Sequence, residues 1–188
     1  MPGIDVYWLP LGAGGHSVRL NGHVYEALVA RVERRRRYDL YHSALVAHVA
    51  TGSYVVEMAP VRDAAGASRG VVAEGAVGTH LAGRLRIFRC EIRRWLGGAI
   101  PDVAEAVDSP RRLSGDQATA FRLLDLVAEV PTPVWGRDEL HAGEMWNSNS
   151  LTSWLISRAG LDVEAITAPL GGRAPGWNAG LVGARAHA

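Results

Sequence analysis

Hydrophobic and polar residues alternate along much of the first half of the chain, which is the spacing of half-buried β-strands. This alternation predicts strands over 5–10, 40–49, 54–58, 71–77 and 84–95. A shorter hairpin is predicted over 17–25 around Asn21-Gly22, because this pair supports a tight turn with positive φ angles. In the last strand the alternation changes phase near Phe88, which indicates a bulge or an edge position.

Helical spacing of apolar residues replaces the alternation in three segments, 26–36, 116–130 and 150–159. In the second of these helices Ser114 and Gln117 fit a capping box, and Phe121 is among the side chains expected to be buried. Gly160 follows the third helix, as glycine often does where the backbone leaves a helix in the left-handed conformation.

The order of these elements, strands first and helices later, favours an α+β fold in which an antiparallel sheet packs against a few helices. A chain of 188 residues suits a single domain over 1–188. The Arg-, Gly- and Ala-rich tail over 171–188 is a candidate for a loose end, with Trp177 as the side chain that can anchor it.

Composition and charge narrow the classes of function. The net charge is +1, so there is no global attraction to nucleic acid or to anionic membranes. All 20 residues counted as Lys or Arg are Arg, which excludes catalysis by lysine. The N-terminus lacks the pattern of a signal peptide, and no segment is long enough to span a bilayer. We therefore expect a cytoplasmic protein with no membrane partner; nothing in the sequence predicts its oligomeric state.

A hydroxyl stands where the third helix begins, in the segment 146–151, Trp-Asn-Ser-Asn-Ser-Leu. Unpaired N–H groups at a helix start can stabilise an oxyanion, so Ser148 is a candidate nucleophile. A serine also needs a general base, and His42 on a strand can supply one. Asn and Ser are equally the preferred capping residues, so a purely structural role explains the same segment.

A strand histidine, a polar residue on the next strand, and a later asparagine–nucleophile pair at a helix start resemble circularly permuted papain-like proteins. These are relatives of NlpC-type peptidases and lecithin–retinol-type acyltransferases. The resemblance covers 42–156 and implies hydrolysis of, or acyl transfer from, an amide, thioester or ester in a small molecule or peptide. The implied catalytic residues are Ser148 as nucleophile, His42 as base and Glu57 as the orienting group. The implied substrate and oxyanion residues are Trp146, Asn147, Asn149 and Ser150.

Two departures from that family pattern matter. The family nucleophile is cysteine, and here the position holds serine, so a second hypothesis is a catalytically inactive papain-like fold that binds a small ligand or a protein partner. Cys90 does not replace it, because this cysteine lies within a predicted strand. A hairpin turning at Thr51-Gly52 would also pair Glu57 with Val46, which leaves His42 too far along the strand for direct contact.

Several polar residues have simpler explanations. His42 can be a structural histidine in the sheet, as can His48 on the same strand face, and Glu57 can pair with Arg62 or Arg86. The run 34–37 is four arginines and can touch nucleic acid or an acidic partner; a solvated helix end is favoured, so nucleic acid is not expected. The histidines lack metal-ligand spacing, and the glycines of 12–15 lack a phosphate-binding motif, so we expect no metal and no cofactor.

Overall fold

The computed structural model describes residues 1–11, 38–61 and 70–186, and the predicted hairpin over 17–25, helix over 26–36, glycine loop 12–15 and arginine run 34–37 lie outside them. The described strands are β1 (Gly3–Pro10), β2 (Asp39–Val49), β3 (Gly52–Pro60), β4 (Val71–Ala76), β5 (Arg89–Leu96), β6 (Val107–Ser114) and β7 (Gly172–Arg173). The α-helices are α2 (Gln117–Leu126), α3 (Ser148–Arg158) and α4 (Trp177–Ala186). Short 3₁₀ turns are η1 (Ala82–Arg84), η2 (Arg86–Phe88), η3 (Val103–Glu105) and η4 (Val127–Glu129).

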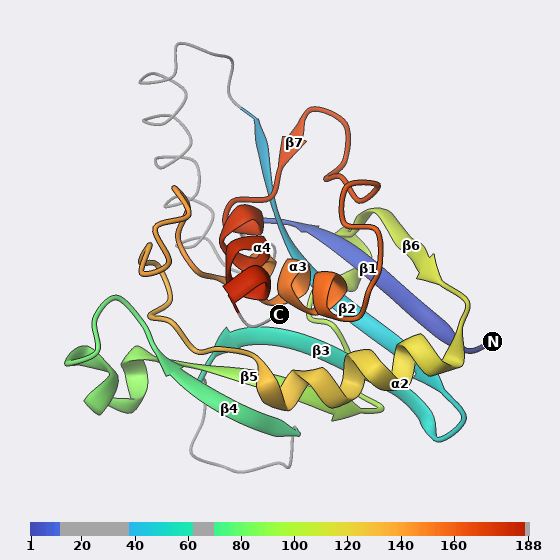
Figure 1. Ribbon diagram of the computed structural model, residues 1–188, viewed down its shortest axis with the longest axis horizontal. Coiled ribbons are helices and arrows are strands. Elements are labelled where there is room, and N and C mark those ends of the chain that lie inside the picture. Colours follow the sequence, from blue (N-terminus) through green and yellow to red (C-terminus); the bar gives the residue numbers. More distant parts are fainter. Residues whose placement is uncertain (12–37, 62–69, 187–188) are drawn as a thin grey trace.

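The strands form one sheet in the order β4-β5-β3-β2-β1-β6, with antiparallel neighbours throughout, and β7 adds a short parallel pair to β2. The three described helices cover one face of this sheet (Figure 1), and their buried side chains share one core with those of the strands. The predicted α+β class is therefore confirmed.

The two faces of the sheet carry different neighbours, because successive strand residues point to opposite sides. On β2, Leu45 and Ala47 belong to the core beneath the helices, and we call this side the helix face. Ala44 and Val46 instead pack with Leu9 in a smaller cluster on the opposite side, which we call the far face. Any residue of β2 is thus assigned to a face by its position in this alternation.

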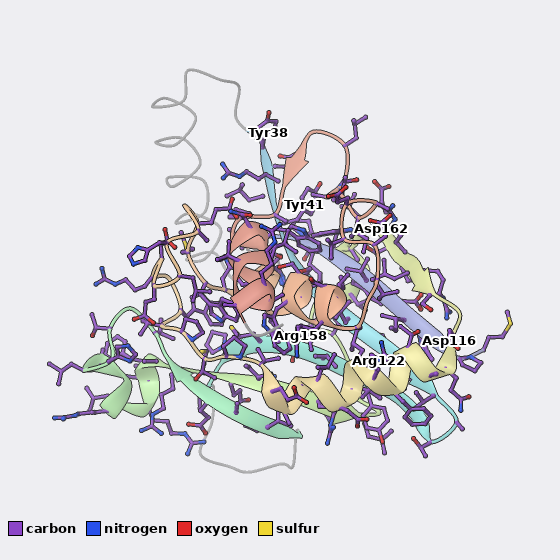
Figure 2. The ribbon with its side chains drawn as sticks, viewed as in Figure 1. Tyr38, Tyr41, Asp116, Arg122, Arg158 and Asp162 are labelled. Atoms are coloured by element: carbon purple, nitrogen blue, oxygen red, sulfur yellow. The ribbon has the colours of Figure 1, made fainter. Side chains whose placement is uncertain are left out.

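Strands β2 and β3 separate at one end of the sheet. Their pairing runs from the turn to Leu45 opposite Val56 and goes no further, whereas β2 stays paired with β1 as far as Tyr41. Beyond this point β2 pairs with β7, and Tyr41 lies close to that strand (Figure 2), where a side chain at Gly172 would collide with its ring. The parting of β2 from β3 leaves the backbone of residues 41–44 without a strand partner on one side, next to the start of α3.

Two parts of the sequence prediction are wrong among the strands. The strand predicted over 84–95 begins only at Arg89, because β4 pairs back no further than this residue; 84–88 forms 3₁₀ turns instead. Strand β6 was not predicted, since Pro110 and two arginines interrupt its apolar pattern. It lies at the edge of the sheet, where a proline is tolerated because one side of the strand needs no backbone partner.

The helices show three further differences. Asp116, rather than Ser114, caps α2 by accepting a hydrogen bond from the Thr119 N–H at 2.7 Å, and Phe121 is exposed rather than buried. The tail expected to be loose forms α4 instead. Trp177 anchors it as expected, with its ring 5.5 Å from that of Trp8. Small residues permit this docking: a side chain at Gly180 would collide with Ser150 and Ser153 of α3.

Candidate functional site

The start of α3 is closed by its own side chains. Asn147 is the N-cap, and its Oδ1 accepts a hydrogen bond from the Asn149 N–H at 2.8 Å. Ser150 Oγ in return accepts one from the Asn147 N–H at 3.0 Å. This reciprocal pair is a capping box, which satisfies N–H groups that a helix start otherwise leaves free. The capping interpretation of the segment is therefore confirmed.

Asn149 ties the helix to the parted strand. Its Nδ2 donates to the carbonyl oxygens of Tyr41 and Pro175, each at 2.9 Å, and its Oδ1 accepts from Ser43 Oγ at 2.8 Å. The residue is 2% exposed, and both of its amide hydrogens have acceptors. Asn149 thus satisfies a backbone carbonyl that β3 leaves unpaired, and it has no remaining donor for a substrate.

The segment before α4 lies across this helix start. Ser150 Oγ donates to the Gly176 carbonyl at 2.7 Å, and Ser153 Oγ donates to the Trp177 carbonyl at 2.7 Å. Asn147 Nδ2 donates to the Pro175 carbonyl at 2.9 Å. Asn147 and Ser150 of the predicted site region, together with Ser153, therefore hold the C-terminal segment in place.

Glu144 fixes the same segment from the other side. Its Oε2 accepts hydrogen bonds from the N–H groups of Gly176 and Asn178, both at 3.0 Å, and so caps α4. Its Oε1 forms an ion pair with Arg173 at 2.8 Å. A carboxylate at a helix start is also stabilised by the helix dipole, so Glu144 holds 173–178 firmly over α3.

The structure does not bring the predicted nucleophile and base together. Ser148 is 8% exposed at the start of α3, and its hydroxyl has no hydrogen-bond partner among the described residues. His42 pairs across the sheet with Leu9 of the far face, whereas its neighbour Ser43 contacts α3 on the helix face. The His42 side chain therefore leaves the sheet on the face opposite to the one that α3 contacts.

His42 sits in an apolar setting. Burial among its neighbours lowers the pKa of its imidazole, and the charge of Asp102 opposes that shift by raising it. The net shift favours the neutral form of the imidazole. Its environment belongs to the far face and to the segment around η3, not to α3.

Glu57 is an ion-pairing residue on β3. Its Oε1 lies 2.9 Å from Nη1 of Arg93, and the two side chains are 11% and 5% exposed. Arg93 also pairs with Glu91 on its own strand. The ion pair of Glu57 with Arg93 was not among the pairings expected, and Arg62, one of the two arginines expected, lies outside the described residues. The expected register is also wrong, because the turn lies one residue earlier and sets Val46 opposite Val55.

The far face holds a relay of side chains that the sequence did not reveal. His48 Nδ1 lies 2.8 Å from Ser53 Oγ, and His48 Nε2 lies 3.0 Å from Asp5 Oδ2. Arg112 Nε lies 2.8 Å from the other oxygen of Asp5. The available signal was the two-residue turn at 50–51, which sets His48 opposite Ser53. The second signal was a buried acid within an apolar strand, because such an acid needs a partner.

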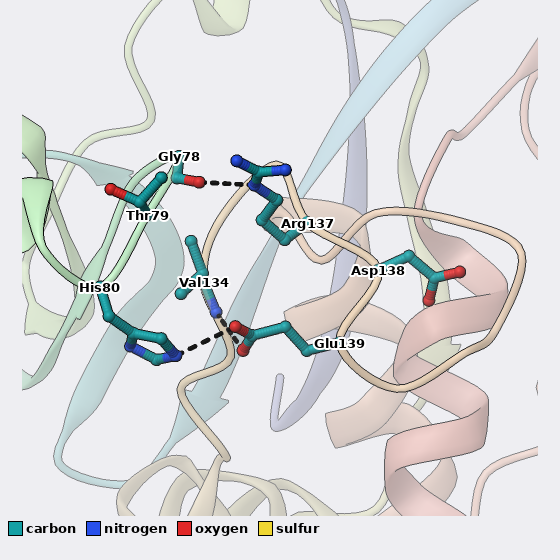
Figure 3. A pocket seen from close by; sticks show the side chains of 7 residues that line it. All are labelled: Gly78, Thr79, His80, Val134, Arg137, Asp138 and Glu139. Atoms are coloured by element: carbon teal, nitrogen blue, oxygen red, sulfur yellow. Dashed lines mark hydrogen bonds and ion pairs between the residues drawn. The ribbon is translucent and has the colours of Figure 1, made fainter.

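A pocket of about 410 Å³ opens between the loops 77–80 and 134–139 (Figure 3). Glu139 accepts from the Val134 N–H at 2.9 Å and lies 3.0 Å from His80 Nε2. Arg137 Nε donates to the Gly78 carbonyl at 2.6 Å. Asp138 accepts from two backbone N–H groups of its own loop. The carboxylates of the pocket are therefore bound internally.

The remaining candidates have structural roles or none. Trp146, expected in a substrate site, is 1% exposed in the core of the helix face. Burial raises the pKa of the Cys90 thiol to about 11, which keeps it protonated and unreactive.

In residues 1–11, 38–61 and 70–186 no cluster of three or more His, Cys, Asp or Glu side chains can hold a metal. No helix within those ranges has the length and apolar character to cross a membrane.

Comparison with known proteins gives no assignment. No family model, no curated protein and no solved structure matches this chain. The functional argument therefore depends on the geometry alone.

We predict that Asn149→Ala destabilises the protein by about 2–4 kcal/mol, because it leaves buried partners of several hydrogen bonds unpaired. Urea unfolding followed by circular dichroism measures this loss. The control is Asn178→Ala, which removes one exposed hydrogen bond to the Ala142 carbonyl and is expected to cost under about 1 kcal/mol. Equal losses in the two variants would contradict the structural role of Asn149.

We predict that His42 makes the protein less stable in mild acid. Its pKa is lower in the folded than in the unfolded state, so its contribution is complete above the unfolded value of about 6.5 and is lost as pH falls below it. The free energy of unfolding is expected to fall by up to about 1.4 kcal/mol per pH unit in this range. Unfolding measured between pH 7.5 and about 5 is expected to show a shallower slope in His42→Gln. The same slope in His42→Gln as in the wild type would refute the prediction.

Proposed function

We propose that this chain is a catalytically inactive papain-like fold that binds a small ligand. One observation carries the proposal: the start of α3, where the family pattern places a nucleophile, is filled by a structural hydrogen-bond network. The N–H of Asn149 is already bound to Asn147, and Ser148 is nearly buried. His42 lies on the far face, so it is not placed to act as the base for this hydroxyl.

The pocket between 77–80 and 134–139 is the site that suits a ligand. Its two carboxylates accept hydrogen bonds from the protein itself, which reduces their repulsion of an anion. Arg137 uses its Nε for the Gly78 carbonyl, and its two Nη groups have no partner among the described residues. A guanidinium with free N–H groups pairs with carboxylate or phosphate in a planar, two-point fashion. The ligand class that this arrangement favours is a small molecule with a carboxylate or phosphate group.

A second candidate function is serine-type ester hydrolysis, favoured by the relay of Asp5, His48 and Ser53. His48 lies 2.8 Å from the Ser53 hydroxyl and 3.0 Å from the Asp5 carboxylate, which are suitable distances for a base between a nucleophile and an orienting acid. Ser53 Oγ would attack an ester carbonyl while its proton passes to His48, and the leaving alcohol would take that proton. Water would then release the acid and regenerate the serine. This candidate retains the predicted reaction class but moves it to different residues.

A fluorophosphonate probe separates these possibilities, and we predict that the wild-type protein is not labelled at Ser148. Mass spectrometry of labelled peptides, with Ser148→Ala and Ser53→Ala as matched variants, locates any adduct. Labelling lost only in Ser148→Ala would overturn the inactive assignment of α3. Labelling lost only in Ser53→Ala, and reduced in His48→Gln, would establish the second candidate.

Ligand binding has its own test, with inorganic phosphate and citrate as probes. We predict saturable binding that Arg137→Gln weakens about tenfold, which corresponds to about 1.4 kcal/mol for a charged hydrogen-bond pair. The control is Arg122→Gln, which removes an equal charge from the exposed side of α2. Equal weakening in both variants would show unspecific charge attraction and would contradict the pocket assignment.

A further inference from the structure

An exposed apolar surface lies at the segment Leu81–Phe88, which we call the tip segment. Leu81, Leu85, Ile87 and Phe88 are 70%, 61%, 79% and 43% exposed. They fall within eight consecutive residues, whereas other exposed large apolar residues are scattered along the described chain. Neighbouring apolar side chains left open to water in this way mark a surface that meets a membrane or a protein.

Basic side chains are interleaved with these apolar ones. Arg84 and Arg86 are both exposed, and no acidic residue occurs between Val77 and Arg89. Arg89 at the end of the run is bound to Glu74 at 3.2 Å. Apolar residues mixed with arginine are the composition of segments that lie in the headgroup region of anionic bilayers. The sequence analysis predicts no membrane partner, because the net charge is low and no segment can span a bilayer. Binding to a membrane surface needs neither a high net charge nor a spanning segment.

The backbone of the tip segment already satisfies most of its own hydrogen bonds. The N–H groups of Arg84, Leu85 and Phe88 donate to carbonyls three residues earlier at 3.2, 2.9 and 2.9 Å. Arg89 Nε donates to the Gly83 carbonyl at 2.6 Å. Peptide groups that are paired in this way enter a poorly hydrated interface at lower cost than open ones.

The position of the tip segment favours a bilayer over a protein pocket. Figure 1 shows η1 and η2 projecting beyond the ends of β4 and β5, at the outer edge of the molecule. Side chains on a projection can enter a lipid surface without any rearrangement of the sheet or helices. We propose that Leu81, Leu85, Ile87 and Phe88 insert into the headgroup region of an anionic bilayer, with Arg84 against the lipid phosphates.

The test is binding of the full chain to vesicles of phosphatidylcholine alone and of phosphatidylcholine with about 30% phosphatidylglycerol. We predict binding to the anionic vesicles only. The double variant Leu85→Ser/Ile87→Ser is expected to weaken it at least about tenfold, because two inserted side chains are lost. Arg84→Gln is expected to weaken it about fivefold, the effect of one basic residue near the surface.

Matched controls replace exposed residues elsewhere. Leu170→Ser/Val103→Ser removes two apolar side chains that are 101% and 48% exposed, and Arg122→Gln removes a charge from α2; both are expected to bind as the wild type does. Absence of binding to anionic vesicles would overturn the proposal. Undiminished binding by a correctly folded Leu85→Ser/Ile87→Ser variant would also overturn it. A wild-type dimer, seen by light scattering, that the tip variant abolishes without any vesicle binding would assign the surface to self-association instead.

Discussion

A single buried amide, that of Asn149, connects the three parts of the molecule that meet at the start of α3. The parted strands leave the Tyr41 carbonyl without a sheet partner, and such a group is costly to bury unpaired. Asn149 supplies the missing donor, accepts from Ser43, and also reaches the Pro175 carbonyl. The position of α3 on β2 and the path of the chain into α4 therefore depend on the same side chain.

This network also decides what the helix start can do chemically. N–H groups that already donate to a capping side chain cannot also stabilise an oxyanion. A side-chain amide whose two hydrogens are both bonded cannot orient a substrate. Ser150 and Asn147 donate to the carbonyls of 175–176, so the C-terminal segment lies across the start of α3. The polar side chains of this segment therefore support structure.

The sequence predicts the elements well where a pattern reports a physical requirement. Alternation predicts β1 to β3 because one side of each strand must be buried, and Gly160 indicates the end of α3 because its φ of 80° suits glycine. It fails at 84–88, where alternating arginines and apolar residues have no neighbouring strand. It also fails at α4, because its small residues serve close helix packing and give little apolar signal.

The placement of His42 away from α3 has a different cause, which is the alternation of side chains along a strand. In a strand, a shift of one residue moves every side chain to the other face. Ser43, not His42, occupies the position that faces α3, and no local pattern distinguishes these alternatives because both faces of β2 are largely apolar. The same alternation places His42 and His48 together on the far face. There the β2–β3 hairpin sets Ser53 opposite His48, and the neighbouring strand β1 supplies Asp5. The partners of a titratable side chain inside a sheet therefore depend on cross-strand register. An error of one residue in the predicted turn assigns the wrong partners to a histidine.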